Sequence, residues 1–209
     1  MSEFLRVLVS RIVTVATVSA AMVVTQAGEL WAAKFNRVLD LGDKAPVWSE
    51  LKGADGERHS LADLKSTDVV VVVFFCNHCP VAKAYEQRLL KLADGVRKQS
   101  VKFVLISVSQ YEADQLEEMK QRATDRKYPF PYLQDPSQKV GREYGAYVTP
   151  QVFVLDRERT IAYMGAIDDS MDPDGVTEHY LRDAISATIA KREPEVRETR
   201  PVGCHIEFE

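Results

Sequence analysis

The sequence predicts an α/β fold, a three-layer sandwich in which a central mixed β-sheet carries helices on both faces. Residues 69–75 are an unbroken run of β-branched and aromatic side chains, as expected of a central strand covered on both faces. An amphipathic helical pattern follows to about residue 96, and residues 102–109 form a second apolar strand pattern. Because strands and helices alternate in this way and a hairpin and a last helix follow, a central mixed sheet with helices on both faces is expected.

The segments before the first central strand are short. Asp55-Gly56 has the chemistry of a tight hairpin turn, and Ser60 is a suitable N-cap for a helical turn. Four elements are expected here: an amphipathic helix within residues 28–41, a strand near 47–51, its return through 57–59 and a helical turn at 61–64.

In the second half of the chain, further helices are followed by an antiparallel hairpin and a last helix. Its expected elements are a charged amphipathic helix at residues 113–126, a short helix at 137–144, a hairpin of 151–155 with 160–164, and a last helix at 176–190. The chain of 209 residues thus reads as one domain over residues 42–192, with a lead-in at 28–41 and a polar tail at 193–209 that carries Cys204.

Composition excludes several classes of protein. The net charge of −4 is spread along the chain, so no basic stripe indicates nucleic-acid binding. Three cysteines are too few for a disulfide-stapled scaffold. No phosphate-binding glycine loop is visible, and neither a cofactor nor a bound metal is expected.

The first 27 residues have the pattern of an export signal. Arg6 and Arg11 precede an apolar stretch at residues 12–24, and small residues allow cleavage after Ala27. The alternative is an uncleaved anchor, although this stretch is shorter than the ~20 residues that span a bilayer. We therefore expect a periplasmic or secreted protein that is not inserted in the membrane after cleavage, in a compartment where disulfides persist.

The central motif is Cys76-Asn77-His78-Cys79-Pro80, where the first predicted strand gives way to a helix. Two cysteines three positions apart can close a disulfide, and a helix N-terminus favours the thiolate form of Cys76. The motif predicts thiol–disulfide exchange through a mixed disulfide on Cys76 that Cys79 resolves. A pair of this kind is also half of a zinc site, although no second pair is present.

Asn77 and His78 are expected to tune the couple. A histidine beside the second cysteine can stabilise the Cys76 thiolate, which stabilises the reduced form and makes the disulfide a stronger oxidant. The predictions are a Cys76 pKa below ~8.5 and a potential less reducing than the roughly −270 mV of thioredoxin.

These motifs together resemble the thioredoxin fold. The Cys-x-x-Cys pair is followed by Val148-Thr149-Pro150, and the opening Gly42-Asp43-x-Ala45-Pro46 is similar to redoxins, which include alkyl-hydroperoxide-reductase/thiol-specific-antioxidant relatives and extracytoplasmic oxidoreductases. The strings at residues 76–82 and 203–206 resemble a redoxin branch of uncertain substrate.

The resemblance implies roles for particular residues. Pro150 would be a cis-proline facing the cysteine pair, and Thr149 would offer its backbone to an extended substrate segment. Thioredoxin keeps a buried aspartate six residues before its first cysteine, where this chain has Val70. Glu86 is a weak substitute, so the proton acceptor for Cys79 stays unassigned.

Three functions remain open from the sequence. The first is an oxidoreductase that exchanges disulfides with protein thiols and a redox partner. A thiol peroxidase is the second, although the Thr and Pro that precede a peroxidatic cysteine are replaced by Val73 and Val69. The third is a Cu(I)- or Zn-binding module. Cys204 is a third redox thiol, a thiol that forms an intermolecular disulfide, or a buried inert one.

Overall fold

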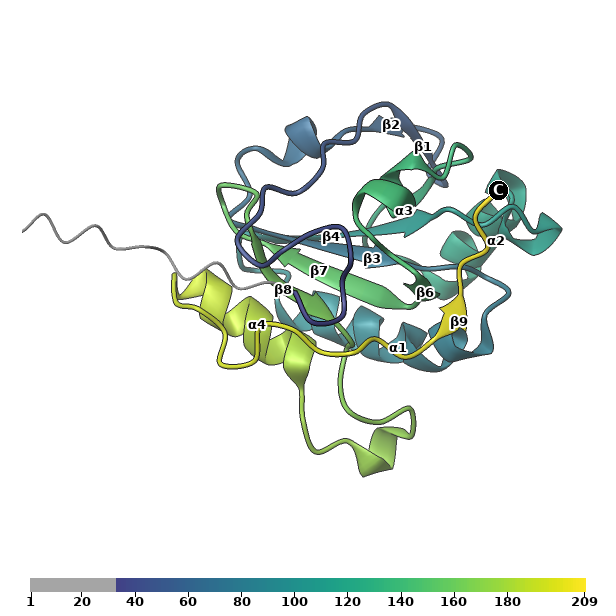
Figure 1. The fold of residues 1–209 in the computed structure, drawn as a ribbon. Coiled ribbons are helices and arrows are strands. Elements are labelled where there is room, and N and C mark those ends of the chain that lie inside the picture. Colours follow the sequence, from purple (N-terminus) through teal and green to yellow (C-terminus); the bar gives the residue numbers. More distant parts are fainter. Residues whose placement is uncertain (1–32) are drawn as a thin grey trace, which may run out of the picture.

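The computed structural model describes residues 33–209, and its central feature is a seven-stranded mixed sheet (Figure 1). The strand order is β2-β1-β5-β4-β3-β7-β8. The neighbours β3–β4 and β4–β5 are parallel, whereas β7 and β8 continue the sheet antiparallel beside β3. The bounds are β1 Leu51–Gly53, β2 Arg58–His59, β3 Val69–Phe74, β4 Val101–Ser107, β5 Tyr132–Gln134, β7 Gln151–Leu155 and β8 Ile161–Gly165.

Helices cover both faces of this sheet, as the sequence predicted. Alternate β3 side chains divide the core, because successive residues of a strand point to opposite faces. Val71 packs in the cluster that also contains residues of three helices: α1 (Pro80–Gly95), α2 (Leu116–Arg126) and α4 (Tyr180–Ile189). Val72 packs on the other face with α3 (Lys139–Glu143) and the 3₁₀ turn Leu61–Leu64.

A second, two-stranded sheet involves the C-terminal tail. Strand β6 (Val148–Thr149) pairs antiparallel with β9 (Cys204–His205), which Figure 1 shows close to the start of α1. The sequence predicted neither β5 nor this pairing. The tail is therefore part of the domain rather than an extension of it.

Three expected helices differ from the structure, and near two of them side chains accept hydrogen bonds from the backbone N–H groups. Within residues 33–41 no helix forms, since the Glu198 carboxylate accepts hydrogen bonds from Lys34, Phe35 and Asn36. The last helix begins at Tyr180 because Asp169 binds the preceding N–H groups.

The helix expected at residues 113–126 is divided. A 3₁₀ turn, Glu112–Asp114, is followed by extended backbone at Gln115 before α2 begins. The export signal at residues 1–27 and the start of the lead-in lie outside the described residues. Within residues 33–209, no helix combines the length and the apolar character needed to cross a membrane.

Candidate active site

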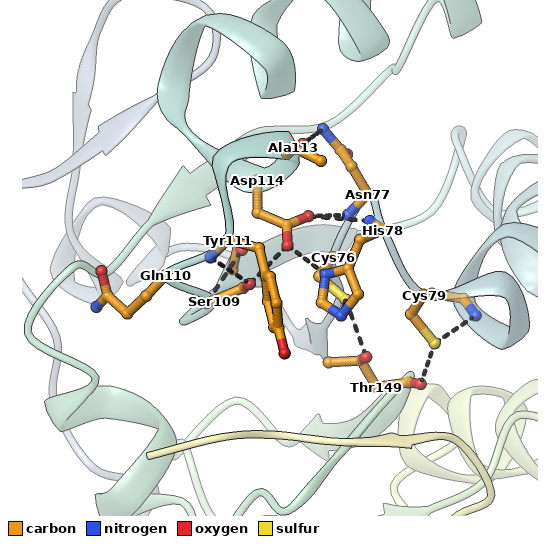
Figure 2. Close-up of polar contacts among 12 residues, drawn as sticks. Cys76, Asn77, His78, Cys79, Ser109, Gln110, Tyr111, Ala113, Asp114 and Thr149 are labelled. Atoms are coloured by element: carbon orange, nitrogen blue, oxygen red, sulfur yellow. Dashed lines mark hydrogen bonds and ion pairs between the residues drawn. The ribbon is translucent and has the colours of Figure 1, made fainter. Parts of the chain in front are cut away.

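Cys76 and Cys79 lie where β3 ends and α1 begins (Figure 2). Cys79 is the N-cap of α1, and its sulfur accepts a hydrogen bond from Ala82 N–H at 3.3 Å. Cys79 is fully buried, whereas Cys76 is 2% exposed and lines a cavity of about 210 Å³. Cys76 is therefore the sulfur of the pair that a substrate can approach.

The two sulfurs share a hydrogen bond that decides where the negative charge lies. The bond from Cys76 lowers the pKa of Cys79 to about 4, against the opposing effect of burial. The same bond, together with burial, raises the pKa of Cys76. The expected low pKa of Cys76 is therefore wrong for the dithiol: the pair loses one proton readily, and the two sulfurs titrate as a unit that shares the proton that remains.

Asp114 is the main site residue that the sequence did not reveal. Its buried carboxylate accepts hydrogen bonds from the backbone N–H groups of Asn77 and His78, and from Ser109 Oγ. It also contacts Nδ1 of His78. A carboxylate only accepts, so Nδ1 carries the proton and Nε2 faces Cys76 Sγ at 4.0 Å (Figure 2).

The sequence contained one signal for Asp114. The strand predicted at residues 102–109 ends shortly before it, and the carboxyl ends of adjacent parallel strands meet at one edge of a sheet. Polar residues just after that strand were therefore candidates to face the cysteine pair.

The two residues between the cysteines have different surroundings. The His78 ring packs on Tyr111, with ring centroids 4.5 Å apart, and its position supports the predicted tuning role. The Asn77 side chain instead donates to Ala113 O at 2.9 Å and accepts from Tyr132 OH at 3.2 Å. Asn77 thus ties the loop to its neighbours and binds neither sulfur.

Thr149 and Pro150 form the opposite wall of the site. Their peptide bond is cis, in agreement with the resemblance. Thr149 Oγ1 lies 3.1 Å from Cys76 Sγ, and its carbonyl oxygen accepts a hydrogen bond from Cys79 Sγ at 3.1 Å. The expectation that the Thr149 backbone is free for a substrate is wrong, because Thr149 already pairs with Cys204 of β9.

The tail also forms one side of the cavity. The tail residues that line it together with Cys76 are His205, Ile206, Glu207 and Glu209. Cys204 is half-buried and packs against the core cluster that contains the cysteine pair. The structure thus brings the six other predicted site residues together with the third cysteine, Cys204.

Neither the position of the missing aspartate, Val70, nor the substitute candidate Glu86 provides a proton acceptor for Cys79. Val70 packs in the apolar core on the face of β3 opposite the cluster that holds the cysteines. Glu86 is buried in a salt bridge with Arg122, at 2.9 Å, and contacts Tyr128. Its carboxylate is therefore a structural charge rather than a proton acceptor.

Three side chains of the site are of the types that can bind a metal ion. Ligand atoms of Cys76, His78 and Asp114 lie within 4.8 Å of one another. The Asp114 oxygens, however, already accept two backbone N–H bonds, one hydroxyl and the His78 ring N–H. The arrangement suits movement of a proton between Cys76 and His78 better than it suits a cation.

Comparisons with known proteins show the family to which the chain belongs. The AhpC/TSA family model matches residues 41–164. An uncharacterized conserved protein from Geobacillus kaustophilus is 34% identical, with a TM-score of 0.77 over 83% of this chain and 95% of that chain. A hypothetical protein from Sinorhizobium meliloti is 30% identical, also with a TM-score of 0.77, over 83% and 97% of the two chains. No functionally curated protein matches the sequence.

More distant structures show the fold alone. The thioredoxin domain of a thiol-disulfide oxidoreductase from Bacteroides vulgatus is 22% identical, with a TM-score of 0.51 over 59% of this chain and 86% of that one. A peroxidoxin from Mycobacterium tuberculosis is 19% identical, with a TM-score of 0.55 over 72% and 94%. The fold is thioredoxin-like, and because the family model covers more than half of the sequence, the protein belongs to the AhpC/TSA family.

Proposed function

We propose that the protein is a thiol–disulfide oxidoreductase whose reacting couple is Cys76–Cys79. The observation that carries this proposal is the arrangement of the two sulfurs. Cys76 lines the cavity and Cys79 lies buried behind it, hydrogen-bonded to it. Thiol–disulfide exchange requires this geometry: one sulfur forms the mixed disulfide with the substrate, and a second sulfur next to it resolves that disulfide.

In the reducing direction, Cys76 gives up its proton and attacks a substrate disulfide. His78 Nε2 is placed to take that proton, and Asp114 holds the ring and stabilises the imidazolium that results. The Thr149 hydroxyl stabilises the Cys76 thiolate by a hydrogen bond, which lowers the pKa of Cys76 against the larger effects that raise it. The leaving sulfur of the substrate departs as a thiolate.

Cys79 then completes the exchange. Its thiolate, stabilised by Ala82 N–H, attacks Cys76 in the mixed disulfide, which forms the Cys76–Cys79 bond and releases the second substrate sulfur as a thiolate. In the oxidising direction the same steps run in reverse. The stabilised thiolate in the reduced form favours that direction.

The clients are protein thiols and disulfides in an extracytoplasmic compartment. The apolar stretch at residues 12–24 supports export. Strand β9 occupies the edge that an extended substrate segment would pair with. A client cysteine therefore reaches Cys76 on a loop or chain end that enters the cavity between Tyr111 and the tail.

Peroxide reduction is the second candidate, supported by the family and by one observation. Although Val73 replaces the threonine before a peroxidatic cysteine, Thr149 supplies a hydroxyl 3.1 Å from Cys76 Sγ from a different part of the chain. A peroxidase would form sulfenate on Cys76 far faster than free cysteine does. A rate equal to that of free cysteine excludes it.

The proposed exchange is tested by trapping its intermediate. In Cys79→Ser, the mixed disulfide on Cys76 cannot be resolved, so an oxidised protein client should stay covalently bound and be released by reductant. Cys76→Ser is the matched control and should trap nothing. Absence of a mixed disulfide on Cys76 with every disulfide tested, in folded protein, would overturn the proposal.

A further inference from the structure

The C-terminal tail is held unusually close to the cysteine pair. Strand β9 places Cys204 directly opposite Thr149. At Gly203, an added Cβ would lie 2.1 Å from the carbonyl oxygen of Thr149 and 3.1 Å from the nitrogen of Pro150. Both are backbone atoms that cannot move aside, so only glycine at position 203 permits this approach.

The tail after Cys204 is fixed by hydrogen bonds to three different parts of the domain. The N–H of Ile206 donates to Tyr147 O at 2.9 Å. The Gln138 side chain donates to Glu207 O at 2.7 Å, and Tyr111 OH donates to the Glu207 carboxylate at 2.9 Å. These contacts hold Cys204 in place without any contribution from its own thiol.

The result is a row of three sulfurs with Cys79 in the middle. Cys204 pairs with Thr149, whose carbonyl oxygen accepts a hydrogen bond from Cys79 Sγ, and the thiols of Cys76 and Cys204 both act on the pKa of Cys79. The first turn of α1 acts on two of the sulfurs: Ala82 N–H donates to Cys79 Sγ at 3.3 Å, and burial raises the pKa of Cys204 while the backbone of Val81 opposes that rise. A helix N-terminus that stabilises either sulfur as a thiolate also stabilises it as attacking or leaving group.

The three sulfurs differ in access. Cys79 is fully buried and Cys76 is 2% exposed at the base of the cavity, whereas Cys204 is half-buried on the outer side of the pair. A disulfide held as Cys76–Cys79 is thus approached through the cavity at Cys76, because the tail closes the substrate-pairing edge beside it. A disulfide at Cys204 is closer to the surface.

We propose that Cys204 is a second resolving thiol, which takes the disulfide from Cys76–Cys79 and carries it as Cys79–Cys204 toward the outer surface. The proposal rests on the proposed function, because exchange on Cys76 supplies the first disulfide. It divides the site into a client side at Cys76 and a partner side at Cys204, on either side of the buried Cys79.

The step is redox-neutral and needs no additional oxidant. The thiolate of Cys204 attacks Sγ of Cys79, the Cys79–Cys204 bond forms, and the Cys76–Cys79 bond breaks with its electron pair on Cys76. The Cys76 thiolate so released takes up the proton lost by Cys204, or attacks a further client disulfide. A dithiol partner then reduces Cys79–Cys204 by attack on Cys204, and the partner is left as a disulfide.

Peptide mapping tests the relay. The oxidised protein is quenched with acid, its free thiols are alkylated, and it is digested with trypsin without reductant. We expect a disulfide link between peptides 66–83 and 198–209 with the alkyl group on Cys76, which fragmentation of the linked peptides locates. Cys204→Ser should lose this link, keep the disulfide within peptide 66–83, and be re-reduced more slowly by a small dithiol.

A second pair of variants keeps all three cysteines. Gly203→Ala should push the tail from Thr149 and lose the link, whereas Gly95→Ala, where an added Cβ meets nothing within 4 Å, should retain it. The relay is wrong if folded wild-type protein never shows the link although Cys79→Ser traps clients on Cys76. If Cys79→Ser traps no client, it is the proposed function that fails.

Discussion

The buried carboxylate of Asp114 contacts Nδ1 of His78, and this contact turns the other ring nitrogen toward Cys76. Asp114 comes from the 3₁₀ turn after β4, whereas His78 lies between β3 and α1. The parallel pairing of β3 with β4 brings these two loops together at one edge of the sheet. A group that acts on Cys76 is thus oriented by a residue far away in the sequence.

Asp114→Asn should slow the reaction of Cys76 with a model disulfide. The asparagine oxygen can still accept from the backbone N–H groups, but it no longer provides the negative charge that stabilises a protonated His78. We expect a loss of about 10²-fold in the exchange rate and an altered pH–rate profile, measured by single-turnover kinetics. Exposed Glu117→Gln is the control. An unchanged profile in folded Asp114→Asn would refute the positioning role.

His78→Ala should make the couple more reducing. Loss of the imidazole beside Cys76 removes stabilisation of the thiolate and therefore of the reduced form. The wild-type potential is expected to be less negative than roughly −270 mV, and each tenfold change in the exchange equilibrium shifts it by about 30 mV. Equilibration with glutathione measures both proteins, with His179→Ala as the control. A potential that does not change in His78→Ala contradicts the tuning role.

The dependence of the potential on pH tests the shared proton. Above the lowered Cys79 pKa of about 4 and below the raised pKa of Cys76, the reduced pair holds one proton. Two-electron reduction then takes up one proton, so the potential should fall by about 30 mV per pH unit rather than by about 59 mV. The stabilisation of the reduced form is lost as pH falls through about 4.

This measurement is best made in Cys204→Ser, so that only the Cys76–Cys79 pair changes its oxidation state. If the potential instead falls by about 59 mV per pH unit at neutral and mildly acidic pH, both thiols of the reduced pair are protonated there.

The sequence predicted those elements whose signal is local. The run at residues 69–75 specified a buried strand because both of its faces are apolar, and Pro80 marked the start of α1. Strands β6 and β9 are only two residues long and carry no periodicity. Their pairing depends on long-range contacts and on the close approach at Gly203, which a sequence pattern does not encode.

The candidate site likewise contains residues that the sequence revealed and residues that it did not. Cys76, Cys79 and His78 were found because they are contiguous with a recognisable strand and helix. Asp114 was missed because its role depends on which strands are neighbours in the sheet. The free edge expected at Thr149 was wrong because the resemblance could not show that the chain supplies its own partner strand.

Thr149→Val should weaken Cys76 as a nucleophile while leaving the backbone pairing with Cys204 intact. The Thr149 hydroxyl lies 3.1 Å from Cys76 Sγ, and its hydrogen bond lowers the pKa of Cys76. Without it, the pKa of Cys76 should rise further and alkylation at a given pH should slow. Thr149→Ser keeps a hydroxyl and should restore the rate. Equal alkylation rates in the valine and serine variants would show that the hydroxyl has no role.

Glu86→Gln should destabilise the folded protein without changing the exchange rate of Cys76. Glu86 is 5% exposed, its salt bridge to Arg122 measures 2.9 Å, and Arg126 lies 3.2 Å away. Removing the carboxylate leaves the half-buried guanidinium of Arg122 without its partner, which should lower the free energy of unfolding by about 3 kcal/mol. Urea denaturation measures this loss.

The exchange rate of Cys76 in Glu86→Gln should be unchanged under conditions in which the variant is folded, since Glu86 takes no proton from Cys79. A slower resolution step in folded Glu86→Gln would instead restore Glu86 as the proton acceptor.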